Sequence, residues 1–247
     1  MKKFSLSEKI YFGLILTLAI LAAINVFLPY PQLIAGATMP APKLVLAIAN
    51  VAMILILYGG LGFTGLVLSK KIGLPEIWDK KVSNREKFLI PLIVGVGLGI
   101  FLIVADMVFA NFNTIGRFVH PPFPNSIIAS GAAGIGEEVI FRLFFIPFWV
   151  WLISFVILKK RFFNQFFWLI SIASALAFSL GHTASIMILY NFTSFGQIPL
   201  VVFGEMILLN GTISLFAAYY FRRFGFLAPV GIHFWTDIVW HVIWGLF

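Results

Sequence analysis

The sequence has 247 residues, of which 61% are hydrophobic and only 11% are charged. Water-soluble proteins carry about 25% charged residues, so this composition excludes an ordinary soluble fold and indicates a protein that is surrounded by lipid. The net charge of +8 does not indicate nucleic-acid binding, because the basic residues lie in short clusters between apolar segments, as membrane-flanking residues do.

Long apolar segments follow one another along the chain, without a linker or an obvious internal repeat. A helix needs about 20 apolar residues to cross a hydrocarbon core of about 30 Å. Segments of this length lie near residues 8–29, 44–69, 88–110, 126–158, 163–190, 199–221 and 226–247. The sequence therefore predicts an all-α, polytopic bundle of transmembrane helices that forms a single domain over residues 1–247.

The first and fourth segments each need a separate interpretation. The first follows Met1 and two lysines and resembles a signal peptide, but its apolar run is longer than a signal core, so we interpret it as an uncleaved span. The fourth is too long for one simple crossing, and Pro147 could break it. The prediction is therefore seven spans, or eight if this break occurs.

The basic residues predict how the spans are oriented. With the N-terminus in the cytoplasm, only Lys43 and Arg117 lie on the opposite side of the cell membrane, and Arg142 lies within a span. All other basic residues then face the cytoplasm: Lys2, Lys3, Lys9, Lys70, Lys71, Lys80, Lys81, Arg85, Lys87, Lys159, Lys160, Arg161, Arg222 and Arg223. The positive-inside rule therefore predicts a cytoplasmic N-terminus and a C-terminus on the other side.

Ionisable residues interrupt the apolar segments, where charge is costly. A charged side chain at the bilayer centre costs roughly 2.5–3.5 kcal/mol, so such residues face a protein interior or a water-filled cavity and are functional candidates. They are Asp106, Glu137, Glu138, His182, Glu205, His233, Asp237 and His241. We expect Asp106 and Glu205 to be hydrogen-bond partners between helices, and His241 to be a structural residue.

The spacing of the remaining residues predicts different roles for two adjacent carboxylates. Glu137 and Glu138 point about 100° apart on a helix. Arg142 follows Glu138 by four residues, which is the spacing of an ion pair along a helix. We therefore expect Arg142 to neutralise Glu138, while Glu137 faces a cavity and acts as a base. His233 and Asp237 are also four residues apart, so the carboxylate can fix the tautomer of the ring.

Two further patterns concern the helices themselves. Counted from the cytoplasmic basic clusters, His182 lies about 15 Å deeper in its span than His233, so its helix is expected to begin near Phe167 or to be broken. A glycine-rich face in the second span is expected to mediate close helix packing, within one chain or between two. Its members are Gly59, Gly60, Gly62 and Gly65.

Three short motifs resemble those of a known family. They are Glu137-Glu-Val-Ile-Phe-Arg142, Phe178-Ser-Leu-Gly-His182 and His233-Phe-Trp-Thr-Asp237. Their order and their places in separate apolar segments are similar to the E-E-x-x-x-R, F-x-x-x-H and H-x-x-x-N/D motifs of the CPBP family of intramembrane proteases, the CAAX-protease and bacteriocin-processing (Abi) family. The resemblance covers about residues 125–240. The family includes type II CAAX prenyl endopeptidases, which remove the last three residues of prenylated proteins.

The resemblance implies a role for each matching residue. Glu137 with His182 would hold and activate the attacking water, and His233 with Asp237 would stabilise the oxyanion. The second glutamate and the arginine of the first motif would support the site. The prenyl endopeptidases usually have Asn at the position of Asp237, and a carboxylate donates no hydrogen bond unless it is protonated. We therefore expect Asp237 to orient His233, which remains the donor.

The reaction that these residues predict is hydrolysis of a peptide bond by an activated water molecule. The chain has neither cysteine nor a G-x-S-x-G motif, which argues against a covalent intermediate. Glu137, His182 and His233 could hold a single zinc ion, as in a metalloprotease, or Glu137 could act as a base without a metal, and the sequence leaves both open. The expected partners are the lipid bilayer and a peptide or prenylated protein C-terminus.

Two other functions are compatible with the same residues. A non-proteolytic membrane protein of this fold, such as a bacteriocin-immunity factor or a scaffold, would need no cleavage. A transporter or proton relay could also use acidic residues and histidines in its spans. Transporters tend to carry internal repeats, and none is evident in this sequence, so the intramembrane endopeptidase is the favoured hypothesis.

Overall fold

The computed structural model describes residues 3–28 and 41–247, and every regular element within these residues is helical. The α-helices are α1 (Leu6–Phe27), α2 (Lys43–Met53), α3 (Gly59–Lys71), α4 (Ile90–Phe109), α5 (Asn125–Glu138), α6 (Ile146–Val150), α7 (Phe163–Gly181), α8 (Thr183–Leu189), α9 (Leu200–Phe224) and α10 (Leu227–Asp237). Wider π-helical segments continue them: η2 (Ile54–Tyr58), η3 (Arg85–Leu89), η4 (Val139–Phe145), η5 (Trp151–Ile157) and η7 (Ile238–Ile243). Short 3-10 turns form η6 (Phe195–Gln197) and η8 (Trp244–Leu246).

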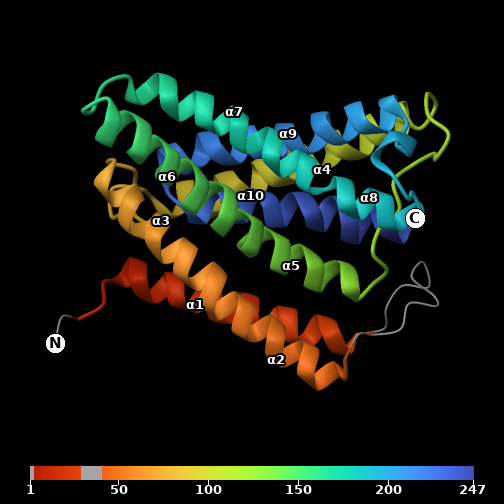
Figure 1. The fold of residues 1–247 in the computed structure, drawn as a ribbon, viewed down its shortest axis with the longest axis horizontal. Coiled ribbons are helices and arrows are strands. Elements are labelled where there is room, and N and C mark those ends of the chain that lie inside the picture. Colours follow the sequence, from red (N-terminus) through yellow and green to blue (C-terminus); the bar gives the residue numbers. More distant parts are fainter. Residues whose placement is uncertain (1–2, 29–40) are drawn as a thin grey trace.

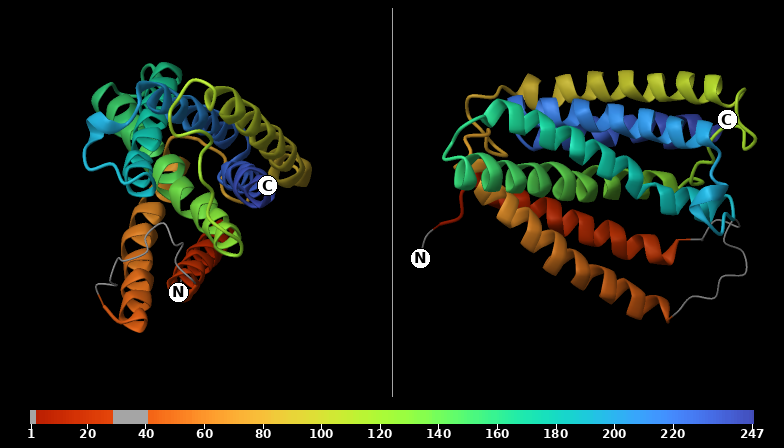
Figure 2. Two further views of the ribbon diagram at one scale, coloured as in Figure 1. Left: turned by 90° about the vertical axis from the view of Figure 1, so that its right-hand side faces the viewer. Right: turned by 45° about the horizontal axis from the view of Figure 1, so that its top comes forward.

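The helices run lengthwise beside one another, and the start of α1 and the end of the chain lie at opposite ends of the bundle (Figure 1). The connections 72–84 and 158–162 and the turn between α9 and α10 lie at one end, which we call the basic end. The connections 110–124 and 190–199 and the last residues lie at the other, which we call the C-terminal end (Figure 2).

Six helices are long and apolar enough to cross a membrane. They cover residues 6–27, 43–71, 85–109, 125–157, 163–189 and 200–224. Many large apolar side chains on them face outward, among them Ile56 and Leu200, as expected for side chains in contact with lipid. The prediction of an all-α integral membrane protein is thus confirmed, and the bounds of these six agree closely with those expected.

The seventh predicted segment also forms a helix, α10 continued by η7, but this helix is not among the six. It carries His233, Asp237 and His241 and packs against α4, α5 and α9. Its polar residues are therefore covered by other helices rather than by lipid. The structure supports six spans by length and composition, with this C-terminal helix enclosed among them.

Pro147 does not break the fourth span, so the eighth span considered from the sequence does not form. Residues 125–157 are one continuous helix. A proline lacks an N–H group, and its ring collides with the carbonyl group four residues earlier, which here belongs to Leu143. The π-helical segment η4 ends just before Pro147 and provides a wider turn at this point, and such local adjustments allow proline within membrane helices.

Part of the glycine-rich face packs within the chain. A Cβ atom on Gly65 would overlap the backbone carbonyl group of Leu143, and one on Gly62 would lie 2.6 Å from the hydroxyl oxygen of Tyr11. Helix α3 can therefore approach both α1 and η4 only because these residues lack side chains. Gly60 is different, since no described atom outside its own helix lies within 4 Å of an added Cβ.

We predict that Gly65→Ala lowers the stability of the protein by about 1–3 kcal/mol, because α3 must move away from η4. The measurement is the apparent melting temperature in detergent. Gly60→Ala is the matched control and should leave the melting temperature nearly unchanged. Equal melting temperatures for the two variants would contradict the packing described here.

Candidate active site

Glu138 is a fully buried carboxylate that is held by two partners. Its Oε1 atom lies 3.1 Å from Nη1 of Arg142, and both side chains have no solvent exposure. The same oxygen lies 2.8 Å from Nδ1 of His233. The ion pair expected from the four-residue spacing is present, but the contact with His233 was not anticipated. Because a carboxylate is an acceptor, the His233 ring donates from Nδ1 and presents Nε2 to the other side.

The Nε2 atom of His233 faces two more carboxylates. It lies 3.6 Å from Oδ2 of Asp237 and 3.8 Å from Oε2 of Glu137. Both distances exceed that of a hydrogen bond, whereas the contact to Glu138 does not. The short hydrogen bond of the ring is therefore made to Glu138, while Asp237, which was expected to orient the ring, is a more distant neighbour of Nε2.

Close helix packing brings these residues together. A Cβ atom on Gly95 of α4 would lie 2.6 Å from the backbone oxygen of Ile232, and one on Gly134 of α5 would lie 3.1 Å from Cβ of Phe234. The hydroxyl group of Thr236 donates a hydrogen bond to the backbone oxygen of Gly95 at 3.1 Å. Helix α10 is thus enclosed tightly between α4 and α5, at the level of the first and third motifs.

The helices change geometry where the motifs lie. Helix α5 becomes π-helical directly after Glu138, and α10 becomes π-helical directly after Asp237. Such segments are frequent at functional sites, because the wider turn changes the direction of the side chains that follow. The fifth predicted span changes too, since α7 ends at Gly181 and α8 begins at Thr183. Of the two expectations for this span, the structure is nearer to the break: a single residue, His182, interrupts the α-helical pattern, while residues 163–189 still form one long span.

His182 and Phe178 connect the second motif to the other two. Nδ1 of His182 lies 2.9 Å from the backbone oxygen of Phe178. A carbonyl group only accepts, so this nitrogen donates and Nε2 of a neutral ring is left as an acceptor. The buried Phe178 ring lies 4.6 Å from the Arg142 guanidinium carbon, and 4.9 Å and 5.7 Å from the rings of His182 and His233. Phe178 therefore packs against members of all three motifs.

A cavity of about 340 Å³ brings the predicted catalytic residues together. Glu137, His182, His233 and Asp237 all line it, whereas Glu138 and Arg142 lie behind this wall. The side chain of Glu137 is 36% exposed and that of Glu138 is not exposed at all. The adjacent carboxylates therefore have the separate environments that their positions on the helix predict.

The remaining ionisable residues lie around this cavity. Asp106 on α4 and Glu205 on α9 are both buried, and the expectation that they are hydrogen-bond partners between helices stays a prediction. Asp106 also accepts a hydrogen bond from the backbone N–H of Phe118, a residue of the cavity wall. His241 lines the cavity, and its Nδ1 atom lies 3.1 Å from Nδ1 of His120. The sequence around His120 carries no signal of a site, because this residue lies in neither a motif nor an apolar segment.

The residues considered as zinc ligands are Glu137, His182 and His233. All three line the cavity, and Nε2 of His233 lies 3.8 Å from Oε2 of Glu137. Among residues 3–28 and 41–247, no group of three or more His, Cys, Asp or Glu side chains is arranged closely enough to hold a metal ion. A zinc ion at this site therefore stays a prediction beside the metal-free alternative.

Comparison with known proteins identifies the part of the chain that carries the motifs. The family model described as Type II CAAX prenyl endopeptidase Rce1-like matches residues 120–239. No curated protein and no solved structure was found to match the chain. The matched segment contains all three motifs, together with α5, α8, α9 and α10, which line the cavity. The family resemblance inferred from the motifs is confirmed.

We predict that Arg142→Met destabilises the protein by about 3–5 kcal/mol, because it leaves the buried Glu138 carboxylate without its cation. The measurement is again the apparent melting temperature in detergent. Arg223→Met, at an exposed arginine of the basic end, is the matched control and should have little effect. Adding Glu138→Gln to Arg142→Met should recover part of the loss, since no uncompensated charge then remains. No recovery would contradict the assignment of the loss to Glu138.

Proposed function

We propose that the protein is an intramembrane endopeptidase that uses Glu137 as its base. Its motif-bearing segment matches the model of the type II CAAX prenyl endopeptidase Rce1-like family, which is a protease family. The observation that carries this proposal is the contrast between two adjacent carboxylates. Glu138 is buried and paired with Arg142, whereas Glu137 reaches the cavity that also holds both motif histidines. A general base must be able to reach the proton that it takes, and of this pair only Glu137 lines the cavity.

His182 supports the activation of water from another wall of the cavity. Because its Nδ1 atom donates to the backbone of Phe178, its Nε2 atom can accept a hydrogen bond from a water molecule. Two acceptors, the carboxylate of Glu137 and Nε2 of His182, then hold the two protons of the water. This arrangement directs a lone pair of the water oxygen toward a peptide carbonyl carbon.

His233 is the group that can stabilise the oxyanion. Its ring orientation is set by the short hydrogen bond to Glu138, and Nε2 points to the cavity. A protonated ring donates from Nε2, and the carboxylates of Glu137, Glu138 and Asp237 stabilise its positive charge. We therefore assign the orientation of His233 to Glu138 and assign to Asp237 a share in balancing the charge of the ring.

The reaction then balances without a covalent intermediate. The water oxygen forms a bond to the carbonyl carbon, one water proton passes to Glu137, and the carbonyl oxygen becomes an oxyanion that accepts from His233. The bond between carbon and nitrogen then breaks, and the proton on Glu137 passes to the leaving amine. The products are a carboxylic acid, which keeps the second proton of the water, and an amine, and Glu137 returns to its ionised form.

The cavity wall suggests an apolar substrate. Apart from the motif residues, it is formed mainly by side chains such as Leu102, Ile186, Leu209 and Ile213. Such a wall suits apolar peptide side chains or the lipid chain of a prenylated C-terminus. We accordingly propose a peptide or a protein tail that is held in the membrane as the substrate class.

We predict that Glu137→Gln reduces peptide cleavage by about 10²–10⁴-fold and leaves the melting temperature unchanged, because the shape is kept and the base is lost. The measurement uses quenched-fluorescence peptides, prenylated and unprenylated, with purified protein in detergent. Glu86→Gln, at the basic end, is the matched control and should cleave like the wild type. Cleavage by Glu137→Gln at the wild-type rate would exclude Glu137 as the base.

A second arm of the same assay addresses the metal. Cleavage that survives a strong zinc chelator supports activation of water by Glu137 and His182 alone. Loss of cleavage that returns on addition of zinc would instead support a metal held by Glu137, His182 and His233. If the wild type cleaves none of the peptides, the non-proteolytic immunity or scaffold function gains support.

A further inference from the structure

We propose that the substrate reaches the active site from the C-terminal end of the bundle, so that the scissile bond lies in the half of the membrane away from the cytoplasm. This proposal rests on the endopeptidase function above. It concerns the substrate class, since it favours exported or externally anchored peptides over cytosolic prenylated tails. Three features of the molecule carry it: the distribution of charge, the closed basic end and the direction of the cavity.

The two ends of the bundle differ in charge. The connections at the basic end hold exposed residues such as Lys80, Lys81 and Lys160, and the neighbouring helix ends add Lys71 and Arg223. Among the lysine and arginine residues of the described ranges 3–28 and 41–247, only Lys43 and Arg117 lie at the C-terminal end. Basic loops face the cytoplasm in membrane proteins, so the positive-inside rule assigns the basic end to the cytoplasm.

The basic end is closed by a packed core. Below the motifs, the side chains of Val139, Leu143, Ile146, Phe221 and Phe226 are almost completely buried in one cluster with α1 and α7. This cluster lies between the active site and the surface of the basic end. A substrate from the cytoplasm would have to cross a region that is packed as densely as a protein interior.

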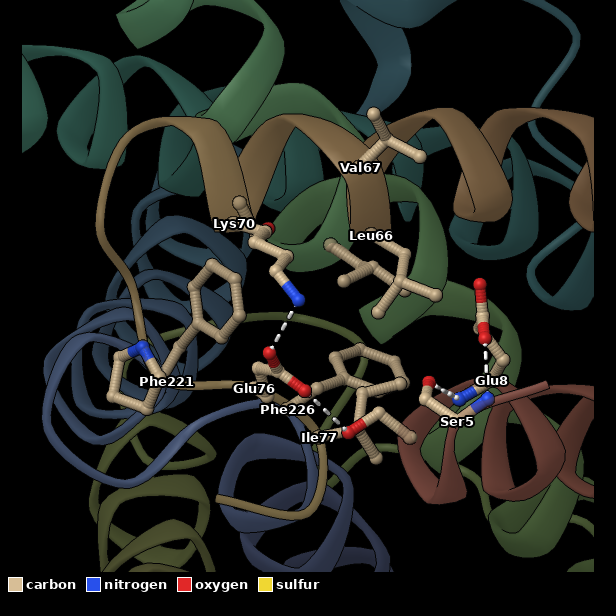
Figure 3. Close-up of a pocket in the computed structure, with 13 residues that line it drawn as sticks. Ser5, Glu8, Leu66, Val67, Lys70, Glu76, Ile77, Phe221 and Phe226 are labelled. Atoms are coloured by element: carbon tan, nitrogen blue, oxygen red, sulfur yellow. Dashed lines mark hydrogen bonds and ion pairs between the residues drawn. The ribbon is translucent and has the colours of Figure 1, made fainter. Parts of the chain in front are cut away.

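Polar contacts fasten the same end from outside. A small pocket of about 80 Å³ lies at this surface, and in it Glu76 contacts residues of both α1 and α3 (Figure 3). Its carboxylate lies 2.8 Å from Nζ of Lys70 and accepts a hydrogen bond from Ser7 at 3.2 Å. The hydroxyl group of Ser7 in turn accepts from the backbone N–H of Trp78 at 3.1 Å. The pocket ends on Leu143 and Phe221, so it leads to the core cluster and not to Glu137.

The active-site cavity runs in the opposite direction. On α5 it is lined by Ala129, Ala133 and Glu137, which lie between the C-terminal end of the bundle and the motif. On α10 and η7 the cavity is lined by His233, Asp237, Trp240 and His241, which follow one another toward the C-terminal end of the bundle. At the C-terminal end itself, residues 118, 119 and 121 of the connection 110–124 form its outer wall.

Helices α5 and α8 both line the cavity, and neither is a main packing partner of the other. Helix α5 packs mainly against α1, α10 and η4, whereas α8 packs against α7 and, through Ile186, against α9. We therefore place the opening of the cavity between α5 and α8. Ser185 on α8 is exposed and Val119 in the outer wall is 38% exposed, although both line the cavity. An opening here faces the lipid of the non-cytoplasmic half and the adjacent water. It suits a peptide whose anchor stays in that leaflet.

The absence of cysteine in the chain permits a direct test of access. Three single-cysteine variants of the full chain are made: Ser185→Cys in the cavity wall, Thr114→Cys as the reference for the C-terminal end, and Lys80→Cys for the basic end. Intact cells are treated with a membrane-impermeant maleimide before and after permeabilisation. We expect Ser185→Cys and Thr114→Cys to be labelled in intact cells, and Lys80→Cys only after permeabilisation. The proposal would be overturned if Ser185→Cys, like Lys80→Cys, were labelled only after permeabilisation, or if it were labelled under neither condition.

A second arm measures cleavage on each side. The Thr114→Cys protein is reconstituted into liposomes, and the fraction of molecules whose residue 114 faces outward is measured by labelling. Preparations with different labelled fractions are then given a quenched peptide whose lipid anchor lies in the outer leaflet. We expect the initial rate to rise in proportion to the labelled fraction. A rate that rises with the unlabelled fraction would overturn the proposal and favour cytosolic tails. The expected labelling without cleavage on either side would leave the access route standing and remove the endopeptidase function instead.

Discussion

The buried carboxylate of Glu138 is the constraint on which the rest of the site depends. It has no solvent exposure and is matched by Arg142 on one side and His233 on the other. An unpaired charge at this depth would be strongly destabilising, so these three side chains must stay together. The requirement joins the end of α5 to the middle of α10 and fixes the ring of His233. Glu137 is the residue before Glu138, so it points about 100° away from Glu138 on the helix and lines the cavity.

Backbone geometry makes this meeting of helices feasible. Glycine residues of α4 and α5 allow α10 to come close, and π-helical turns follow both Glu138 and Asp237. The wider turn before Pro147 also lets one long helix continue from the active site to the basic end. Glycine and proline would weaken a helix in water. In this bundle glycine allows neighbouring helices to pack closely, and proline is accommodated by a local change in helix geometry.

The two halves of the bundle have different tasks. The half toward the basic end is a dense core in which α1, α3, α6, α7 and α9 are held together, and its surface is tied by Glu76. The half toward the C-terminal end contains the cavity, the interruption at His182 and helix α8. The dense core and the cavity are thereby separated along the length of the bundle. The candidate catalytic residues lie at the boundary between them, where the core can position them.

The class of protein, the bounds of its apolar helices and the candidate site residues could all be predicted from the sequence, because lipid imposes length and hydropathy on each span and makes every buried charge conspicuous. The pairing of Glu138 with Arg142 could be predicted too, since that contact depends only on helical spacing. Three other contacts are visible only in the folded protein: Glu138 binds His233, Phe178 packs against members of all three motifs, and His120 contacts His241. These contacts join residues far apart in the chain, and no local pattern encodes the distance between two helices. The continuation of the helix through Pro147 and the direction of the cavity were likewise decided by packing, because both depend on which neighbouring helix fills the space.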